Sequence, residues 1–123
     1  GEEDTIAKIE QHKHSEQDER KGIIEEYLNT KYPDNWSSMD LYDRRRWLED
    51  PLSQAGTMQK DFVCVAEIWC ECLGKEKNDM SRYNTRDIND IMRSLSDWEA
   101  STSTKNFSIY GKQKYYKRKD SLL

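Results

Sequence analysis

The side chains best suited to chemistry in this sequence are cations and amides spaced to bind a polyanion. Arg86, Asn89 and Arg93 recur at intervals of three and four residues, which places them on one face of a helix. Lysines interleaved with aromatic residues follow toward the C-terminus, and this combination suits a phosphate backbone with some stacking or sugar contact. The candidate DNA-binding residues are Arg82, Asn84, Thr85, Arg86, Asn89, Arg93, Lys105, Lys112, Lys114, Tyr116, Lys117 and Arg118.

The charge of the chain is unevenly distributed. The formal net charge is -4 over 123 residues, but residues 82–123 hold nine Lys or Arg against five Asp or Glu, whereas residues 1–60 hold nine against 14. A cationic segment on an otherwise acidic chain favours a polyanionic partner at one surface. Asp87, Asp90 and Asp97 lie close to the cationic helix and are expected to repel phosphates.

Motifs for nucleotide binding or catalysis are missing from these 123 residues. The chain contains no GxxxxGK[ST], GxGxxG, HExxH or GxSxG pattern. Its two histidines, His12 and His14, are two residues apart, so on a helix they point to different sides and do not suit a zinc site. Cys70 and Cys72 have the same spacing, and we interpret them as buried, reduced thiols. We therefore expect no catalytic residue, no cofactor and no metal in this chain.

Other charged groups have an ordinary structural interpretation. Glu25 with Glu26, and Glu67 with Glu71, are predicted to lie on outer helix faces, where paired carboxylates are usually solvated. The arginine run at 44–46 could grip phosphate. One of three successive helical residues usually turns inward, however, and lays its stem along the core.

These side chains must be positioned by a small helical domain. Apolar spacing and capping signals predict helices over about residues 16–30, from a cap at Ser37 to about Glu49, over residues 62–73, and from a cap at Asn84 through Leu95. Gly74 is well placed to end the third of these helices. Residues 53–61 have turn chemistry and room for one short strand. Residues 98–101 and 112–117 are predicted to be strands of a β-hairpin with a long loop.

Three helices, one short strand and a hairpin follow the order of a winged helix-turn-helix. We predict a mainly α fold with a small β-hairpin (α+β), in which a winged-helix-like C-terminal half is preceded by an N-terminal helix. In such a fold the recognition helix enters the major groove and the wing reaches backbone or an adjacent groove. The predicted organisation is a flexible lead-in at 1–15, one domain over 16–123 with a helical support segment at 16–50 and a winged-helix-like core at 57–118, and a flexible tail at 119–123.

Most of the chain consists of runs that resemble one known family. They are VCVAEIWCECLGKEKNDMSRYNTRDINDIMRSLSDWE (63–99), the following STKNFSIYGKQKYYKRK, and GIIEEYLNTKYPDNWSSMDLYDRRRWLED (22–50). The first two resemble the C-terminal region of the virulence-associated protein E family, which bacteriophages and mobile islands of Gram-positive bacteria encode. The third resembles the segment that precedes this region.

Full-length relatives resemble phage replication proteins with a helicase-like ATPase of the superfamily 3 kind, sometimes joined to a primase. The resemblance implies that the Walker motifs lie upstream of Gly1, so this fragment is not expected to be an enzyme. We expect a non-catalytic accessory domain whose partners are duplex or forked DNA and the helicase domain of the same polypeptide. Its expected location is the cytoplasm. No window approaches the roughly 18 apolar residues of a membrane helix, the N-terminus lacks the basic and apolar regions of a signal peptide, and the three cysteines are interpreted as reduced thiols. The resemblance to a family encoded by phages and mobile islands implies that this is the cytoplasm of a bacterial host.

A protein-docking or oligomerisation module of the same replication protein is the alternative interpretation. In that case the acidic helices and exposed aromatic residues hold neighbouring helicase subunits or a host replication factor, and the basic C-terminal segment is incidental.

Overall fold

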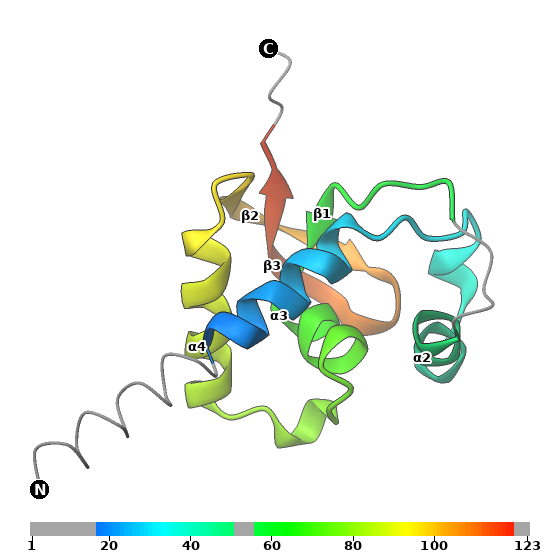
Figure 1. Cartoon of the computed structure of the whole chain (residues 1–123), viewed down its shortest axis with the longest axis horizontal. Helices are drawn as coiled ribbons and strands as arrows, with labels where there is room; N and C mark the ends of the chain where they lie inside the picture. The colour runs from blue at the N-terminus through cyan, green and yellow to red at the C-terminus, as the bar shows by residue number, and fades with distance from the viewer. Residues whose placement is uncertain (1–16, 51–55, 120–123) are drawn as a thin grey trace, which may run out of the picture.

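Helices and a small antiparallel sheet make up this chain, which a computed structural model describes at residues 17–50 and 56–119. The helical elements are residues 17–29, η1 (Trp36–Ser38), α2 (Leu41–Glu49), α3 (Val65–Glu67), η2 (Ile68–Cys72), η3 (Lys77–Asp79), α4 (Arg82–Ser94) and η4 (Ser108–Tyr110). The strands are β1 (Phe62–Val63), β2 (Trp98–Phe107) and β3 (Gly111–Arg118). Their arrangement in Figure 1 confirms the predicted α+β class.

The three strands form one sheet in the order β1-β3-β2, and both pairs are antiparallel. β2 and β3 are the strands of the predicted hairpin, and their ladder continues until Phe107 lies opposite Gly111. The prediction of a long loop between them is wrong, because only the short turn at Ser108–Tyr110 joins the two strands. Phe107 and Tyr110 are both buried, so packing of these two rings holds the tip of the hairpin against the protein.

The short strand predicted within residues 53–61 lies just beyond that segment, at Phe62–Val63. Inside the segment, Met58 forms an isolated antiparallel bridge with Tyr32, and residues 53–55 are not among those described. Gly56 has a steric role beside this bridge, because a Cβ at its position would overlap the backbone of Tyr32. Two segments far apart in the sequence therefore pass each other at close range here.

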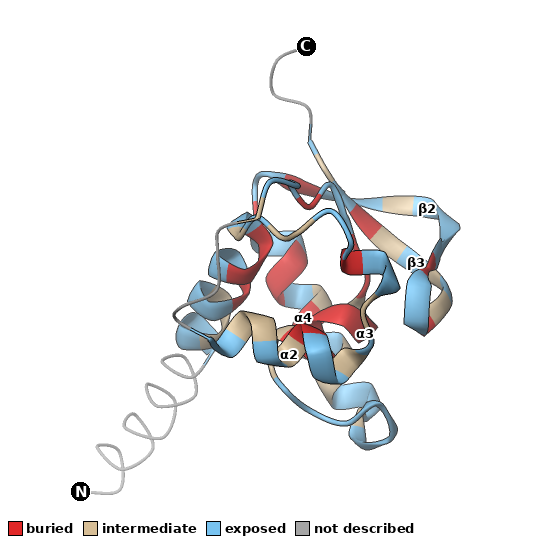
Figure 2. Cartoon of the chain, turned by 90° about the vertical axis from the view of Figure 1, so that its right-hand side faces the viewer, coloured by how far each residue is buried: buried red, intermediate tan, exposed pale blue. Residues whose placement is uncertain are grey.

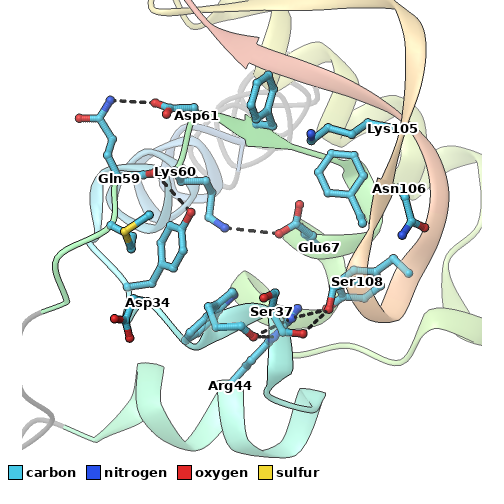
Figure 3. Close-up of a pocket in the computed structure, with 16 residues that line it drawn as sticks. Asp34, Ser37, Arg44, Gln59, Lys60, Asp61, Glu67, Lys105, Asn106 and Ser108 are labelled. Atoms are coloured by element: carbon cyan, nitrogen blue, oxygen red, sulfur yellow. Dashed lines mark hydrogen bonds and ion pairs between the residues drawn. The ribbon is translucent and has the colours of Figure 1, made fainter.

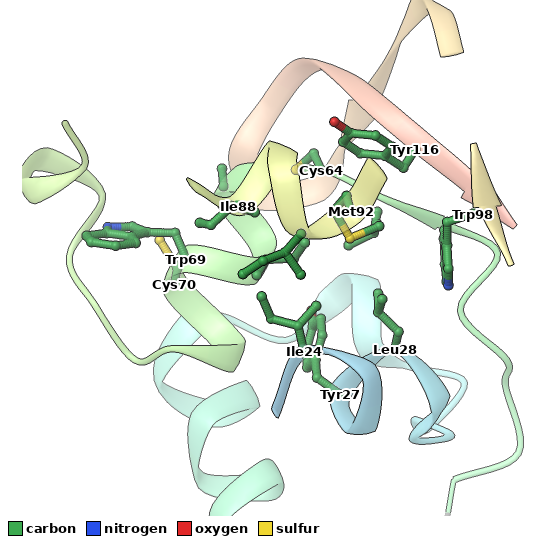
Figure 4. Close-up of a cluster of buried hydrophobic side chains, with 14 of the residues drawn as sticks. Ile24, Tyr27, Leu28, Cys64, Trp69, Cys70, Ile88, Met92, Trp98 and Tyr116 are labelled. Atoms are coloured by element: carbon green, nitrogen blue, oxygen red, sulfur yellow. The ribbon is translucent and has the colours of Figure 1, made fainter. Parts of the chain in front are cut away.

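The apolar core lies between the helix at residues 17–29, α4 and the sheet. Ile24 and Leu28 repeat at helical spacing and face Ile88 and Met92 of α4 (Figure 4). The predicted apolar face of α4 is confirmed, because Ile88, Ile91, Met92 and Leu95 are all buried. Figure 2 shows buried residues on the inner sides of the helices and exposed residues on their outer sides.

The helix predicted over residues 62–73 is divided into shorter elements. Phe62 and Val63 belong to β1, and the helix begins after Cys64 as α3 and widens into the π-helical η2. Gly74 ends it with a positive φ of 66°, as predicted. The prediction that Glu67 and Glu71 lie on an outer face is wrong, because each residue is only 5% exposed.

Two helix caps also differ from the prediction. Asp40 caps α2, where its side chain accepts a hydrogen bond from the backbone N–H of Asp43, whereas Ser37 belongs to η1. Ser81 caps α4, and Asn84 is the third residue of the helix in a reciprocal capping box. Each cap satisfies a free N–H group at a helix start. The predicted end of α2 at Glu49 is confirmed.

The predicted lead-in at residues 1–15, with His12 and His14, lies outside the described residues. The same holds for the predicted tail at 119–123 except for Lys119, whose backbone N–H bonds the carbonyl of Asp97. Within residues 17–50 and 56–119, no helix has the length and apolar character to cross a membrane.

Candidate nucleic-acid interface

The polar face of α4 carries most of the predicted contact residues. Its sequence alternates apolar positions that pack on the core with polar positions one half-turn away, so the helix presents the latter outward. One hollow of about 470 Å³ lies on this face. The hollow is lined by Met80, Ser81, Arg82, Thr85, Arg86, Asn89 and Arg93. The structure thus brings five of the predicted residues together, and three of them are arginines.

β3 packs against this same helix face through Tyr116. The Tyr116 hydroxyl donates a 2.6 Å hydrogen bond to Oδ1 of Asn89. Burial raises the pKa of Tyr116, and the neighbouring Arg93 guanidinium opposes that shift. Tyr116 is buried, so its ring is not free to stack on a base as predicted, and it instead joins the strand to α4.

Side-chain alternation along β3 separates the predicted lysines into two groups. Lys112 and Lys114 are at even steps from Tyr116 and therefore share its face of the strand. Lys105 lies opposite Gln113 in the ladder, so it is on the other face together with Lys117. All four lysines are exposed.

The lysines of the second group have neighbours within the protein. Lys105 Nζ lies 4.6 Å from the centre of the Phe62 ring, and Lys117 Nζ is 3.5 Å from a carboxylate oxygen of Glu99. The pairing with Glu99 reduces the charge that Lys117 offers to an anion. Lys112 and Lys114 are therefore the lysines that the structure assigns to the same side as α4.

Arg118 has a structural role that differs from the predicted contact. Its guanidinium donates hydrogen bonds to the backbone carbonyls of Lys60 and Leu28 and lies 4.6 Å from the ring centre of Trp98. These contacts tie the end of β3 to the helix at residues 17–29. Asn84 also has a structural role, because its side-chain oxygen accepts hydrogen bonds from Ser81 in the α4 cap.

The carboxylates near α4 repel phosphate less than the sequence suggests. Asp87 forms an ion pair with Arg20 of the N-terminal helix and is largely buried, so its charge is balanced on the side of α4 away from the hollow. Asp90 is exposed on the helix, and Asp97 follows it in the turn before β2. The repulsion predicted for Asp87 is therefore compensated within the protein.

The arginine run at 44–46 divides as the sequence suggests. Arg44 turns inward and is buried, which confirms the expectation that one of the three does so. Arg45 donates hydrogen bonds to the backbone carbonyls of Cys70 and Lys75. Arg46 is exposed, with its guanidinium 5.7 Å from the ring centre of Tyr42. Two of the three arginines thus bind the protein itself.

Glu71 is the centre of a buried hydrogen-bond network that was not predicted from the sequence. Its carboxylate accepts hydrogen bonds from Arg44 at 2.9 Å and from the hydroxyls of Tyr27 and Tyr110, each at 2.7 Å. Burial, reinforced by the Glu71 charge, raises the pKa of both tyrosines well above the usual range. Both phenols therefore stay protonated and serve as donors.

Glu67 belongs to a second buried pair. Its carboxylate lies 3.3 Å from Nζ of Lys60 and also accepts from the backbone N–H of Cys64. Burial raises the pKa of Glu67, and the Lys60 charge opposes the shift. The burial of Glu67 and Glu71 could have been predicted from residues 63–73, which place apolar side chains on nearly every side of a helix. A helix that is apolar all round is buried, and its few polar residues are buried with it.

The prediction that Cys70 and Cys72 are buried is confirmed for Cys70 and is wrong for Cys72. Cys64 and Cys70 are buried and Cys72 is half-buried. Burial raises the pKa of Cys64 and of Cys72 to about 12, so both thiols are protonated near neutral pH. In the part of the chain that the structure describes, no three His, Cys, Asp or Glu side chains gather in a way that could hold a metal ion.

No family model and no curated protein matches this chain.

Proposed function

We propose that this chain is a non-catalytic DNA-binding domain with a winged helix-turn-helix arrangement. With η1 and α2 as an insertion between helix 17–29 and β1, the order of helix 17–29, β1, the α3–η2 helix, α4, β2 and β3 supports this proposal, as does the sheet order β1-β3-β2. In that arrangement α4 is the recognition helix and the β2–β3 hairpin is the wing. The hairpin tip differs from a free wing, because it is packed back on the protein through Phe107 and Tyr110.

The observation that carries the proposal is the shared hollow of Arg82, Arg86 and Arg93 on α4, with β3 docked beside it. Guanidinium groups bind phosphate oxygens with paired donors, and exposed cations release counterions when they neutralise phosphates. The arginines would contact DNA, and Lys112 and Lys114 would add phosphate contacts from the same side. The side-chain oxygen of Asn89 accepts a hydrogen bond from Tyr116, which leaves the amide NH2 group to donate to a base edge.

Fluorescence anisotropy with labelled duplex and single-stranded oligonucleotides tests this proposal. We expect duplex binding at low salt that weakens steeply as salt rises. Arg86→Glu should reduce affinity at least tenfold, whereas Lys31→Glu, the same change of charge at an exposed site far along the chain, should have a small effect. Absence of binding to either nucleic acid at low salt would remove the proposal.

The wider setting follows from the family resemblance. We propose that the domain positions a phage or prophage replication helicase on duplex or forked DNA in the bacterial cytoplasm, with the motor supplied by another part of the polypeptide. Joining the domain to such a motor should increase unwinding of forked substrates. The same increase with an Arg86→Glu domain would argue against DNA contact as its cause.

Exposed large side chains support the docking alternative. Tyr42 and Tyr83 are about two-thirds exposed, and Ile23 is about half exposed. Tyrosine is enriched at the centres of protein interfaces. Replacing Lys112, Lys114 and Lys117 with Glu separates the two functions: loss of DNA affinity supports the first, and unchanged DNA behaviour with altered self-association in light scattering supports the second.

A further inference from the structure

A cavity of about 390 Å³ lies between the tip of the hairpin, η1 and the segment that leads into β1 (Figure 3). It shares no lining residue with the hollow on α4. Its size falls within the range of pockets that bind small organic ligands. Aromatic side chains supply much of its wall: Tyr32, Trp36, Phe62, Phe107 and Tyr110.

One part of this cavity is a buried ion pair. Lys60 and Glu67 point toward one another with 3.3 Å between Nζ and Oε2, and each residue is only 5% exposed (Figure 3). The rings of Tyr27 and Tyr32 flank the ammonium group of Lys60, with ring centres 5.0 and 4.9 Å away. Desolvating a buried pair of this kind costs free energy. The pair places a charged donor and a charged acceptor beside the cavity.

The rim of the cavity combines flat apolar surface with a cation. Phe62 and Met58 line it and are 41% and 45% exposed, which is high for such apolar side chains. Lys105 lies over the Phe62 ring, and the next residue of β2, Asn106, is exposed and also lines the cavity (Figure 3). A planar ligand could therefore stack on an aromatic wall and reach polar groups at its edge.

The charges limit which ligand fits. The ionisable lining residues apart from the tyrosines are three cations and three carboxylates, namely Arg44, Lys60, Lys105, Asp34, Asp61 and Glu67. A polyanion gains little in such a balanced site, and an aliphatic ligand would use none of its donors and acceptors. A neutral heteroaromatic ring with donors and acceptors on its edge, and one anionic group at the exposed lysine, matches the distribution.

We propose that this cavity binds a nucleobase carrying a phosphate, with the ring against the aromatic wall and the phosphate at Lys105. The base presents its hydrogen-bonding edge to Asn106 and to the Lys60–Glu67 pair. Two sources supply this chemistry: a free mononucleotide and an unstacked base of a single strand. The inference goes beyond the proposed function, because it concerns a different surface from the α4 face.

The test uses 2-aminopurine fluorescence with the whole chain. The probes are 2-aminopurine riboside, its 5′-monophosphate and a single-stranded oligothymidylate with one central 2-aminopurine. We expect saturable fluorescence changes with the monophosphate, the strand or both, and binding of the monophosphate at least threefold tighter than that of the riboside. Saturation by the monophosphate assigns the site to free nucleotides, and saturation by the strand alone assigns it to single-stranded nucleic acid.

Two variants connect such binding to the cavity. Phe62→Leu keeps apolar volume but removes the flat ring, and should weaken binding at least fivefold. Lys105→Gln should abolish the preference for the monophosphate over the riboside, whereas Lys114→Gln, the same change on the opposite face of the sheet, should retain it. Phe62 and Lys105 are both exposed, so neither change is expected to unfold the protein.

No saturable change with any probe, or changes that persist unaltered in both variants, would overturn the inference. Duplex anisotropy measured on the same samples keeps this result separate from the proposed function. Duplex binding that depends on Arg86, without any 2-aminopurine response, refutes the cavity site alone. A 2-aminopurine response that depends on Phe62 and Lys105, without duplex binding, supports the cavity site and refutes the α4 interface.

Discussion

Replacing Arg44 with Leu should strongly destabilise the protein, because this guanidinium is the hub of a buried network. It donates to Oε2 of Glu71 at 2.9 Å, to the backbone carbonyl of Trp36 at 2.9 and 3.2 Å, and to Oγ of Ser108 at 3.0 Å. The variant leaves the Glu71 carboxylate buried without its cation. Removing one partner of a buried ion pair typically lowers the free energy of unfolding by about 3–5 kcal/mol.

A loss of that size is a large part of the roughly 5–15 kcal/mol that stabilises a typical domain. A chain of 123 residues lies between the domain sizes for which each 1 kcal/mol lowers Tm by about 4–8 °C and by about 2–4 °C, so at about 4 °C per kcal/mol Arg44→Leu should lower Tm by at least about 10 °C. Urea unfolding followed by far-ultraviolet circular dichroism measures the loss in the free energy of unfolding. Adding Glu71→Gln should restore part of the stability, because the unpaired charge is then removed.

Arg46→Leu is the matched control for this measurement. Arg46 lies on the same helix, is exposed and contacts the Tyr42 ring, so its loss should lower the free energy of unfolding by less than about 1 kcal/mol. Equal losses for Arg44→Leu and Arg46→Leu would refute the account of the network. A double variant no more stable than Arg44→Leu would show that the Glu71 charge is not the cause.

Two further predictions concern the other buried polar contacts. Tyr116→Phe removes the hydroxyl that donates to Asn89, and urea unfolding should show a loss of about 0.5–1.5 kcal/mol; no loss would mean that this bond does not hold β3 to α4. The raised pKa of Glu67 means that the folded state binds its proton more tightly than the unfolded chain does, so stability relative to Glu67→Gln should fall as pH rises above the ordinary pKa of glutamate. Urea unfolding across pH measures the free energy of unfolding of both proteins. A free energy of unfolding that rises with pH in the native protein relative to Glu67→Gln would contradict the sign.

The sequence allowed α4 and the hairpin strands to be predicted because their signals are local. Ile88, Ile91 and Met92 repeat with the helical period, and all three are buried in the structure. That repeat also specifies the opposite face, which is why Arg86 and Arg93 could be placed together before any contact was known. Periodicity was sufficient for this part of the candidate interface.

The buried charges could not be predicted because their partners come from distant parts of the chain. Glu71 is satisfied by Arg44, Tyr27 and Tyr110, which precede or follow it by 27, 44 and 39 positions. A local pattern shows a glutamate on a helix and does not show the partners that make its burial possible. The same holds for Tyr116, whose contact with Asn89 depends on how β3 crosses α4.

The salt dependence of duplex binding tests the central claim most directly. Five cations are assigned to one side, namely Arg82, Arg86, Arg93, Lys112 and Lys114, so a plot of log affinity against log salt should have a slope of about -4.5. The double variant Arg86→Gln/Arg93→Gln should make the slope shallower by about 1.8. A slope that this double variant leaves unchanged would contradict the account.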